Sequence, residues 1–145
     1  MGFFDKLFGG KSKDENTAKF TNQSKTVLTP LQGKVLAQAD IPDETFAQGI
    51  LGPGCGIEPT GDTVYAPFDG TVTQIATTLH AVGITSNDGI ELLIHVGMDT
   101  VDMKGQGFTA LVKEGQKVTA GTPLLKVDLD AIRAAGHPTA TAIIV

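Results

Sequence analysis

The chain has 145 residues, of which 41% are hydrophobic and 19% charged, and its formal net charge is −5. This length allows one domain with a real hydrophobic core, and the acidic balance argues against nucleic acid as a partner. A single cysteine excludes an internal disulfide and fits a reducing cytoplasm. No apolar run approaches the roughly 20 residues of a membrane-spanning helix, and no signal-peptide pattern opens the chain.

Charge and composition divide the chain into three segments. Residues 1–25 hold five of the eleven basic and three of the sixteen acidic residues. The net charge is therefore +2 in this segment and −7 in the rest of the chain. Residues 1–10 are predicted to form an amphipathic segment that orders on a membrane surface or a partner, or else frays. Its apolar stripe consists of Phe3, Phe4, Leu7 and Phe8. Residues 11–25 are polar and are predicted to be a flexible linker, followed by one domain over 26–145.

Short runs with strand-like composition follow one another through this domain. A Pro-led turn with one helical turn is expected within 40–49, a loop at 52–56, and a helix over 131–135 capped by Asp130 and ended by Gly136. The spacing of the strand runs, at roughly 8–12 residues, predicts an all-β sandwich or barrel. The predicted strands cover 27–31, 33–37, 63–66, 71–75, 80–85, 90–95, 108–112, 117–118, 124–129 and 142–145.

The central pair of runs predicts a β-hairpin with a histidine at the far end of each strand. His80–Thr85 and Ile90–His95 flank the turn cluster Ser-Asn-Asp-Gly. A four-residue loop places His80 opposite His95, and a two-residue turn makes them diagonal neighbours, with β-carbons within about 5–8 Å in either case. A three-residue loop shifts the register by one and sends them to opposite faces. Two of the three simple registers therefore build a paired-imidazole site.

Several sequence motifs follow one another from residue 66 onward. They are Ala66–Val72, His80–Ile84, Leu93–Val101, Gly105–Phe108, the glycine-spaced run Val112–Gly121 and Val127–Leu129. Together these motifs resemble the glucose-type EIIA component of the bacterial sugar phosphotransferase system. The resemblance spans about residues 27 to 145, and residues 1–10 are also similar to the start of free-standing members.

The resemblance implies an antiparallel β-sandwich of the duplicated hybrid-motif type, barrel-like, with short helical turns. It also implies a phosphoryl carrier in which the position of His95 accepts the phosphoryl group and the position of His80 lies beside it. The implied donor is the carrier protein HPr, and the implied acceptor is a cysteine of an EIIB domain that serves sugar uptake and phosphorylation. Family members run on past Val145 with a closing hairpin, so we expect that hairpin to be missing here.

The residues around the histidines suit this chemistry. Imidazole is a good phosphoryl carrier because it is largely neutral near pH 7 and is also a good leaving group. His80 is expected to donate a hydrogen bond to the phosphoryl oxygens, and the hydroxyl of Thr78 to orient His80. Asp99 is expected to be a charge at the rim, and Leu93 to surround the histidines with apolar surface. The alternative interpretations make Thr78 a plain strand former and Asp99 a turn residue.

The resemblance also implies a docking surface for partner proteins. Phe46, Ile50 and Leu51 match positions near the site in the family, and we expect them to form its exposed apolar centre. Asp43 and Asp99 would form an acidic rim that speeds encounter with a basic partner.

Other functions need features that the sequence lacks or leaves open. A biotinyl or lipoyl carrier needs a lysine at the hairpin tip, which here reads Ser86–Gly89, and a zinc peptidase of the lysostaphin kind needs a His-x-His pair. A regulatory protein-binding module remains compatible, because family members also dock to other proteins. We expect no cofactor and no required metal. His80 and His95 are expected to supply two of zinc's four ligands, an incomplete site.

Overall fold

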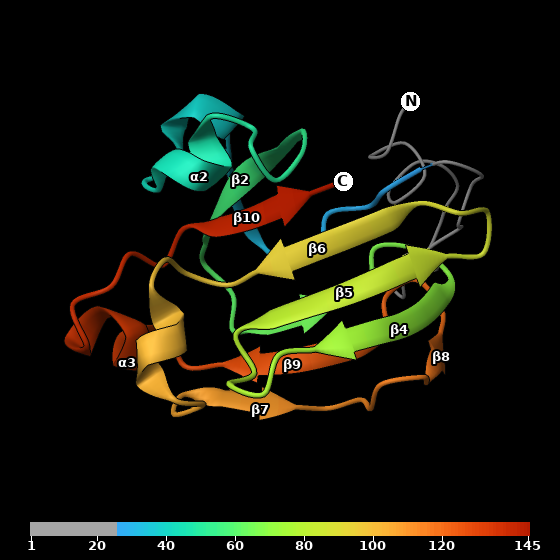
Figure 1. The fold of residues 1–145 in the computed structure, drawn as a ribbon. Helices are drawn as coiled ribbons and strands as arrows, with labels where there is room; N and C mark the ends of the chain where they lie inside the picture. Colours follow the sequence, from blue (N-terminus) through green and yellow to red (C-terminus); the bar gives the residue numbers. More distant parts are fainter. Residues whose placement is uncertain (1–25) are drawn as a thin grey trace, which may run out of the picture.

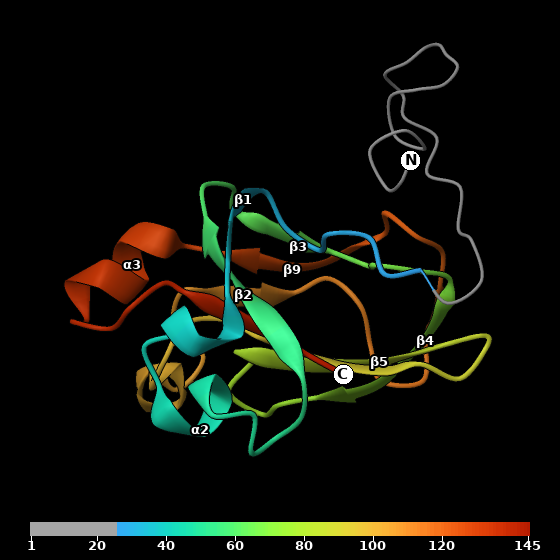
Figure 2. The same ribbon diagram turned by 90° about the horizontal axis from the view of Figure 1, so that it is seen from above.

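The computed structural model describes residues 26–145, and the predicted segments 1–10 and 11–25 lie outside this range. All paired strands are antiparallel, and they form a seven-stranded and a three-stranded sheet that face each other across the core. Figure 2 shows the three-stranded sheet on one side of the larger sheet and helix α2 on the other. The predicted all-β sandwich is confirmed, although the sheets do not close into a barrel within the described range.

The strand order places the last strand of the sequence inside the larger sheet (Figure 1). That sheet runs β1 (Gly33–Leu36), β2 (Gly54–Pro59), β10 (Thr141–Ile144), β6 (Glu91–His95), β5 (Ala81–Ser86), β4 (Gly70–Ile75) and β8 (Lys117–Val118). The smaller sheet runs β3 (Thr63–Tyr65), β9 (Pro123–Val127) and β7 (Phe108–Ala110). The short helices are η1 (Gln38–Asp40), α2 (Glu44–Ala47), η2 (Thr100–Met103) and α3 (Leu129–Ala134).

Alternation along the strands separates the core from the outer face of the larger sheet. Leu92 and Ile94 of β6 are buried in the core, together with Val82 and Ile84 of the neighbouring β5. Leu93 and His95, which alternate with these residues along β6, point to the opposite face because side chains alternate along a strand. The face that carries His95 is therefore the outer face of this sheet.

A second, smaller hydrophobic cluster covers part of this outer face. It consists of Ile41, Phe46, Met98, Ala142 and Ile144, with the half-buried Leu93 packed against it. Helix α2 contributes Phe46, and the carboxylate of Asp43 caps this helix by accepting from the backbone N–H groups of Thr45 and Phe46. The cluster fixes α2 on the sheet beside the end of β6.

Two sequence predictions for backbone structure are wrong near β1 and β2. Residues 27–31 form no strand, although Leu28 and Leu31 are buried. The predicted loop at 52–56 instead contributes its last three residues to β2. A Cβ on Gly54 would lie 1.9 Å from the carbonyl oxygen of Ile143. The glycine here permits close approach to β10, rather than a turn.

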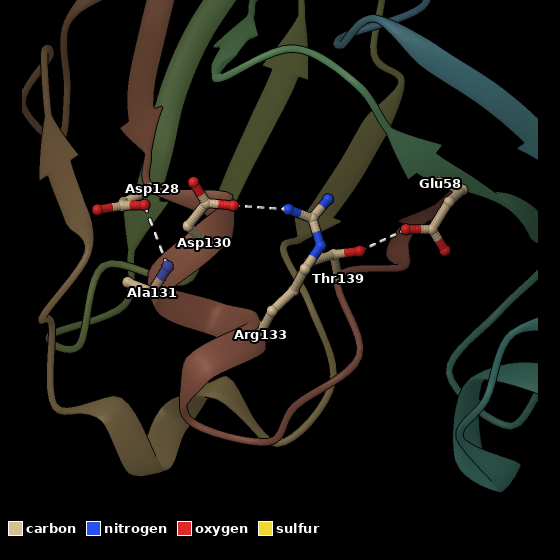
Figure 3. Close-up of polar contacts among 6 residues, drawn as sticks. All are labelled: Glu58, Asp128, Asp130, Ala131, Arg133 and Thr139. Atoms are coloured by element: carbon tan, nitrogen blue, oxygen red, sulfur yellow. Dashed lines mark hydrogen bonds and ion pairs between the residues drawn. The ribbon is translucent and has the colours of Figure 1, made fainter.

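Helix α3 begins earlier than the sequence predicted, because Asp128 and not Asp130 caps it. The carboxylate of Asp128 accepts from the backbone N–H of Ala131, whereas Asp130 pairs with Arg133 at 3.0 Å (Figure 3). The same view shows the hydroxyl of Thr139 donating to the carboxylate of Glu58. That bond joins β2 to the segment that leads into β10.

Candidate active site

The β5–β6 hairpin has the third of the predicted registers, the one with a three-residue loop. In this register strand alternation alone would place His80 and His95 on opposite faces of the sheet. Ala81 pairs with His95, and the backbone N–H of Ser86 donates to the carbonyl of Ile90 at 2.8 Å, which leaves a three-residue loop. Ser86 closes this loop because its hydroxyl donates to Asp88 and accepts from the backbone N–H of Ile90. The two predicted registers that bring the histidines together are therefore wrong.

The two imidazoles nevertheless meet, because His80 does not belong to β5. It is the last residue of the loop 77–80, across which the backbone N–H of Ala76 donates to the carbonyl of Ala81 at 2.9 Å. Strand alternation does not apply to a loop residue. The ring centroids of His80 and His95 lie 4.8 Å apart with an edge-to-face angle of 82°. The paired-imidazole site is thus present, built from a loop and a strand end.

His95 is held in one orientation by its own strand end and by α2. Its Nδ1–H donates to the carbonyl oxygen of Gly97 at 2.9 Å. A carbonyl oxygen only accepts, so the neutral ring carries its proton on Nδ1 and its lone pair on Nε2. The ring of Phe46 lies 4.9 Å from that of His95, tilted by 54°. The hydrogen bond to the Gly97 carbonyl leaves Nε2 as the nitrogen with the lone pair, and the contact with Phe46 helps to hold the ring in place.

The structure places Thr78 in contact with His80, as the sequence predicted. Their Oγ1 and Nδ1 atoms lie 2.7 Å apart, and His80 is only 8% exposed. Thr78 reaches this position from the same loop as His80, not from a strand face.

Burial lowers the pKa of both histidines below the ordinary value. For His80, burial acts first and the neighbouring charge of His95 adds to it. For His95, burial outweighs the opposing effects of the Gly97 carbonyl and of the carboxylates of Asp43 and Asp99, which raise its pKa. The neutral form of both rings therefore predominates at pH 7, and in this form a lone pair is available for nucleophilic attack.

The backbone turn after β6 depends on Gly97. Its φ is +73°, and a Cβ there would lie 2.6 Å from Cγ2 of Thr100 and 3.0 Å from the carbonyl oxygen of Pro138. Thr100 is fully buried, and its hydroxyl donates to the carbonyl of Val96 at 2.6 Å. The position of the Gly97 carbonyl, and with it the His95 ring, is set by this packed turn.

The predicted docking residues divide into a buried and an exposed group. Ile50 and Leu51 are 67% and 52% exposed, as expected, but Phe46 is buried and the expectation that it is exposed is wrong. Phe46 is drawn inward because α2 packs its apolar side on the outer face of the sheet. Val101, which was not among the predicted docking residues, is 50% exposed and follows Asp99 by two residues.

The histidine pair has no further metal ligand among residues 26–145. No group of three or more His, Cys, Asp or Glu side chains in this range is arranged to hold a metal ion.

A cleft of about 1000 Å³ lies elsewhere, between β9, α3 and the loop 59–62, and contains none of the predicted site residues. Residues 26–145 contain no helix with the length and hydrophobicity of a membrane span.

Comparison with known proteins identifies the family of the chain. Residues 25–145 match the family described as phosphoenolpyruvate-dependent sugar phosphotransferase system, EIIA 1. The chain is 44% identical over 142 residues to the PTS system glucose-specific EIIA component of Halalkalibacterium halodurans, covering 98% of this chain and 82% of that protein. It is 42% identical over 145 residues to the PTS system beta-glucoside-specific EIIBCA component of Bacillus subtilis, of which it spans 23%.

A solved structure shows the same fold. The glucose permease IIA from Mycoplasma capricolum superposes with a TM-score of 0.80 and 35% sequence identity, covering 85% of this chain and 80% of that one. These matches extend over the whole sandwich and do not favour a biotinyl or lipoyl carrier. The chain belongs to the EIIA 1 family of the phosphoenolpyruvate-dependent sugar phosphotransferase system, whose members carry a phosphoryl group on histidine.

Proposed function

We propose that His95 accepts a phosphoryl group from phosphorylated HPr and passes it to a cysteine of an EIIB domain. The observation that carries this proposal is the 2.9 Å hydrogen bond from Nδ1–H of His95 to the Gly97 carbonyl, which leaves the lone pair on Nε2. Fusion of the matching segment to EIIB and EIIC parts in a relative named EIIBCA supports the choice of acceptor.

The transfer needs no group beyond the two proteins that meet. The lone pair of Nε2 forms a bond to phosphorus while the nitrogen–phosphorus bond of phospho-HPr breaks, and that electron pair stays on the donor imidazole. In the second step a cysteine thiolate of EIIB attacks phosphorus, and the electron pair returns to Nε2 of His95. Between the steps the phosphorylated ring carries positive charge, which the Gly97 carbonyl and the carboxylates of Asp43 and Asp99 stabilise.

His80 supports the phosphoryl group rather than receiving it. If the hydroxyl of Thr78 donates to Nδ1 of His80, the proton of that neutral ring lies on Nε2. The Nε2–H is then a donor to the phosphoryl oxygens, on which charge accumulates during transfer. The edge-to-face arrangement of the rings brings this donor beside His95.

The exposed residues around the histidines form the docking surface for both partners. Its apolar part consists of the exposed Ile50, Leu51 and Val101. Its acidic rim consists of the half-buried Asp43 and the exposed Asp99, whose carboxylates both raise the pKa of His95. An exposed apolar patch beside a nucleophile is typical of a partner site. Regulatory partners that recognise the phosphorylation state would use this same surface, because it contains the group that changes.

We also propose that residues 1–10 contact anionic membrane surfaces without taking part in transfer. Their apolar stripe and the local charge of +2 over residues 1–25 support this role. Deleting residues 1–10 should weaken sedimentation with anionic vesicles and leave phosphorylation by HPr unchanged. Loss of phosphorylation in solution would contradict the proposal.

Phosphorylation of histidine variants tests the roles directly, with His137→Gln as the control for the third histidine. We expect His95→Gln to accept no phosphoryl group from HPr when read by intact mass. We expect His80→Gln to be phosphorylated but to pass the group to EIIB about 10²–10³-fold more slowly, the typical effect of losing one such donor. A phosphorylated His95→Gln together with an unmodified His80→Gln would reverse the assignment.

A further inference from the structure

Leu79, the residue before His80, has a left-handed backbone with φ of +63°. Among residues 26–145 the other non-glycine residues with positive φ are Asp99 and Lys104, which flank η2. Glycine, asparagine and aspartate adopt this conformation readily, whereas a branched apolar side chain rarely does. A conformation of this kind beside a proposed catalytic residue calls for a functional explanation.

The backbone around Leu79 shows what the left-handed residue does. The N–H of Leu79 donates to the carbonyl of Ala76 at 2.8 Å, which closes a turn immediately before His80. His80 then accepts one ladder bond from the N–H of Val96, while the hydroxyl of Thr100 donates to the carbonyl of Val96. The regular ladder therefore begins only at Ala81.

A regular strand through position 80 would place the imidazole on the wrong face. The observed register would pair His80 with Val96, and partners in a ladder share one face. Val96 is fully buried in the core, whereas His95 lies on the outer face. With this hairpin register, an extended backbone at positions 79 and 80 would direct the His80 ring away from His95.

We propose that Leu79 is a positioning residue for phosphoryl transfer: its left-handed backbone takes the chain out of the β5 ladder and turns the ring of His80 toward His95. This inference rests on the proposed role of His80 in the transfer step. It assigns the effect to the backbone conformation of Leu79 and not to its side chain, which is half-buried and packs against the main core.

Two substitutions separate the backbone from the side chain. Leu79→Ile keeps the size and hydrophobicity of the side chain, but its β-branch opposes a left-handed backbone. Leu79→Asn removes the apolar side chain, but asparagine tolerates that backbone. If the backbone positions His80, the chemically conservative change to isoleucine is the harmful one and the polar change is tolerated.

The first measurement is independent of transfer. In NMR spectra of the unphosphorylated chain, ring-to-ring NOEs between His80 and His95 report the 4.8 Å contact directly. We expect Leu79→Asn to retain these NOEs and Leu79→Ile to lose them. Should Leu79→Ile fail to fold, Leu79→Ala replaces it, because alanine removes the apolar side chain as asparagine does but disfavours a left-handed backbone. We then expect Leu79→Ala to lose NOE intensity relative to Leu79→Asn, and equal NOEs in the two variants would overturn the proposal.

The second measurement is transfer from the phosphorylated chain to EIIB. We expect Leu79→Asn to transfer much faster than Leu79→Ile, which should fall toward the about 10²–10³-fold loss expected for His80→Gln. An isoleucine variant that keeps both the NOEs and the rate, or an asparagine variant that loses both, would overturn the positioning role. Full transfer by His80→Gln would instead contradict the proposed function, while the NOEs would still decide whether Leu79 positions the ring.

Discussion

At the scale of single residues, the site depends on which nitrogen of each histidine carries a proton. The Gly97 carbonyl assigns the proton of His95 to Nδ1, and Thr78 contacts the corresponding nitrogen of His80. Both contacts involve Nδ1, whereas the proposed phosphoryl group lies on the Nε2 side of each ring. We therefore expect the turn that presents the Gly97 carbonyl to influence the reactivity of His95.

We expect Gly97→Ala to impair phosphorylation of His95 as well as folding stability. Alanine at φ of +73° is strained, and its Cβ would lie 2.6 Å from the buried Thr100, so the Gly97 carbonyl must move. Strain of this kind costs about 1–3 kcal/mol. Gly89→Ala is the matched control, because Gly89 has φ of +98° and a Cβ there would meet no atom within 4 Å. Urea unfolding and phosphorylation by HPr should show that both variants lose stability but only Gly97→Ala loses rate, and equal phosphorylation rates would contradict the account.

The presence of a histidine pair could be predicted from the sequence, but its geometry could not. The predicted hairpin between His80 and His95 is present in the structure. Its register is not one of the two that were predicted to bring the histidines together, because Ser86 closes a three-residue loop. Three competing turns fit the same four residues, and the choice depends on side-chain hydrogen bonds. The left-handed Leu79, which compensates for that register, has no signature in the sequence because leucine rarely adopts this backbone.

At the scale of elements, α2 links the core of the sandwich to its proposed docking surface. Asp43 caps the helix, Phe46 packs inward against His95, and Ile50 and Leu51 follow on the exposed side. The sequence predicted a helical turn here but could not assign its inward face. Four helical residues show too little periodicity to separate a buried from an exposed apolar side chain.

We expect Ile50→Ser and Leu51→Ser to slow phosphoryl transfer with HPr while leaving folding stability nearly unchanged. Both side chains are mostly exposed, so their removal costs little in the free protein but takes apolar surface from the docked complex. Leu111→Ser is the control, since Leu111 is 47% exposed and follows β7 in the other sheet. The concentration dependence of phosphorylation would separate the variants, and an equal effect of Leu111→Ser would argue against a local docking surface.

At the scale of the whole molecule, two neutral histidines link the stability of the fold to pH. Their pKa values in the folded protein are lowered, mainly by burial, relative to about 6.5 in the unfolded chain. Below that value the unfolded state binds more protons than the folded state, so stability falls as pH decreases. The contribution of the two histidines to the free energy of unfolding is complete above about pH 6.5. It is lost as the pH falls through the lower pKa values that they have in the folded protein.

We therefore expect the melting temperature to fall between pH 7 and pH 5 more steeply for the unmodified chain than for His80→Gln/His95→Gln. Glutamine does not titrate, so the double variant lacks this part of the pH dependence. Identical slopes in the unmodified chain and the double variant would show that the pair does not titrate as described.

The central claim is that the phosphoryl group is carried on Nε2 of His95, and site-resolved NMR of the phosphorylated chain tests it most directly. After phosphorylation by HPr, phosphorus–nitrogen and nitrogen–proton correlations of the ¹⁵N-labelled protein identify both the histidine and the ring nitrogen. The account predicts phosphorus on Nε2 of His95, with the Nδ1 proton retained and hydrogen-bonded to the Gly97 carbonyl. Phosphorus on His80, or on Nδ1 of His95, would contradict it.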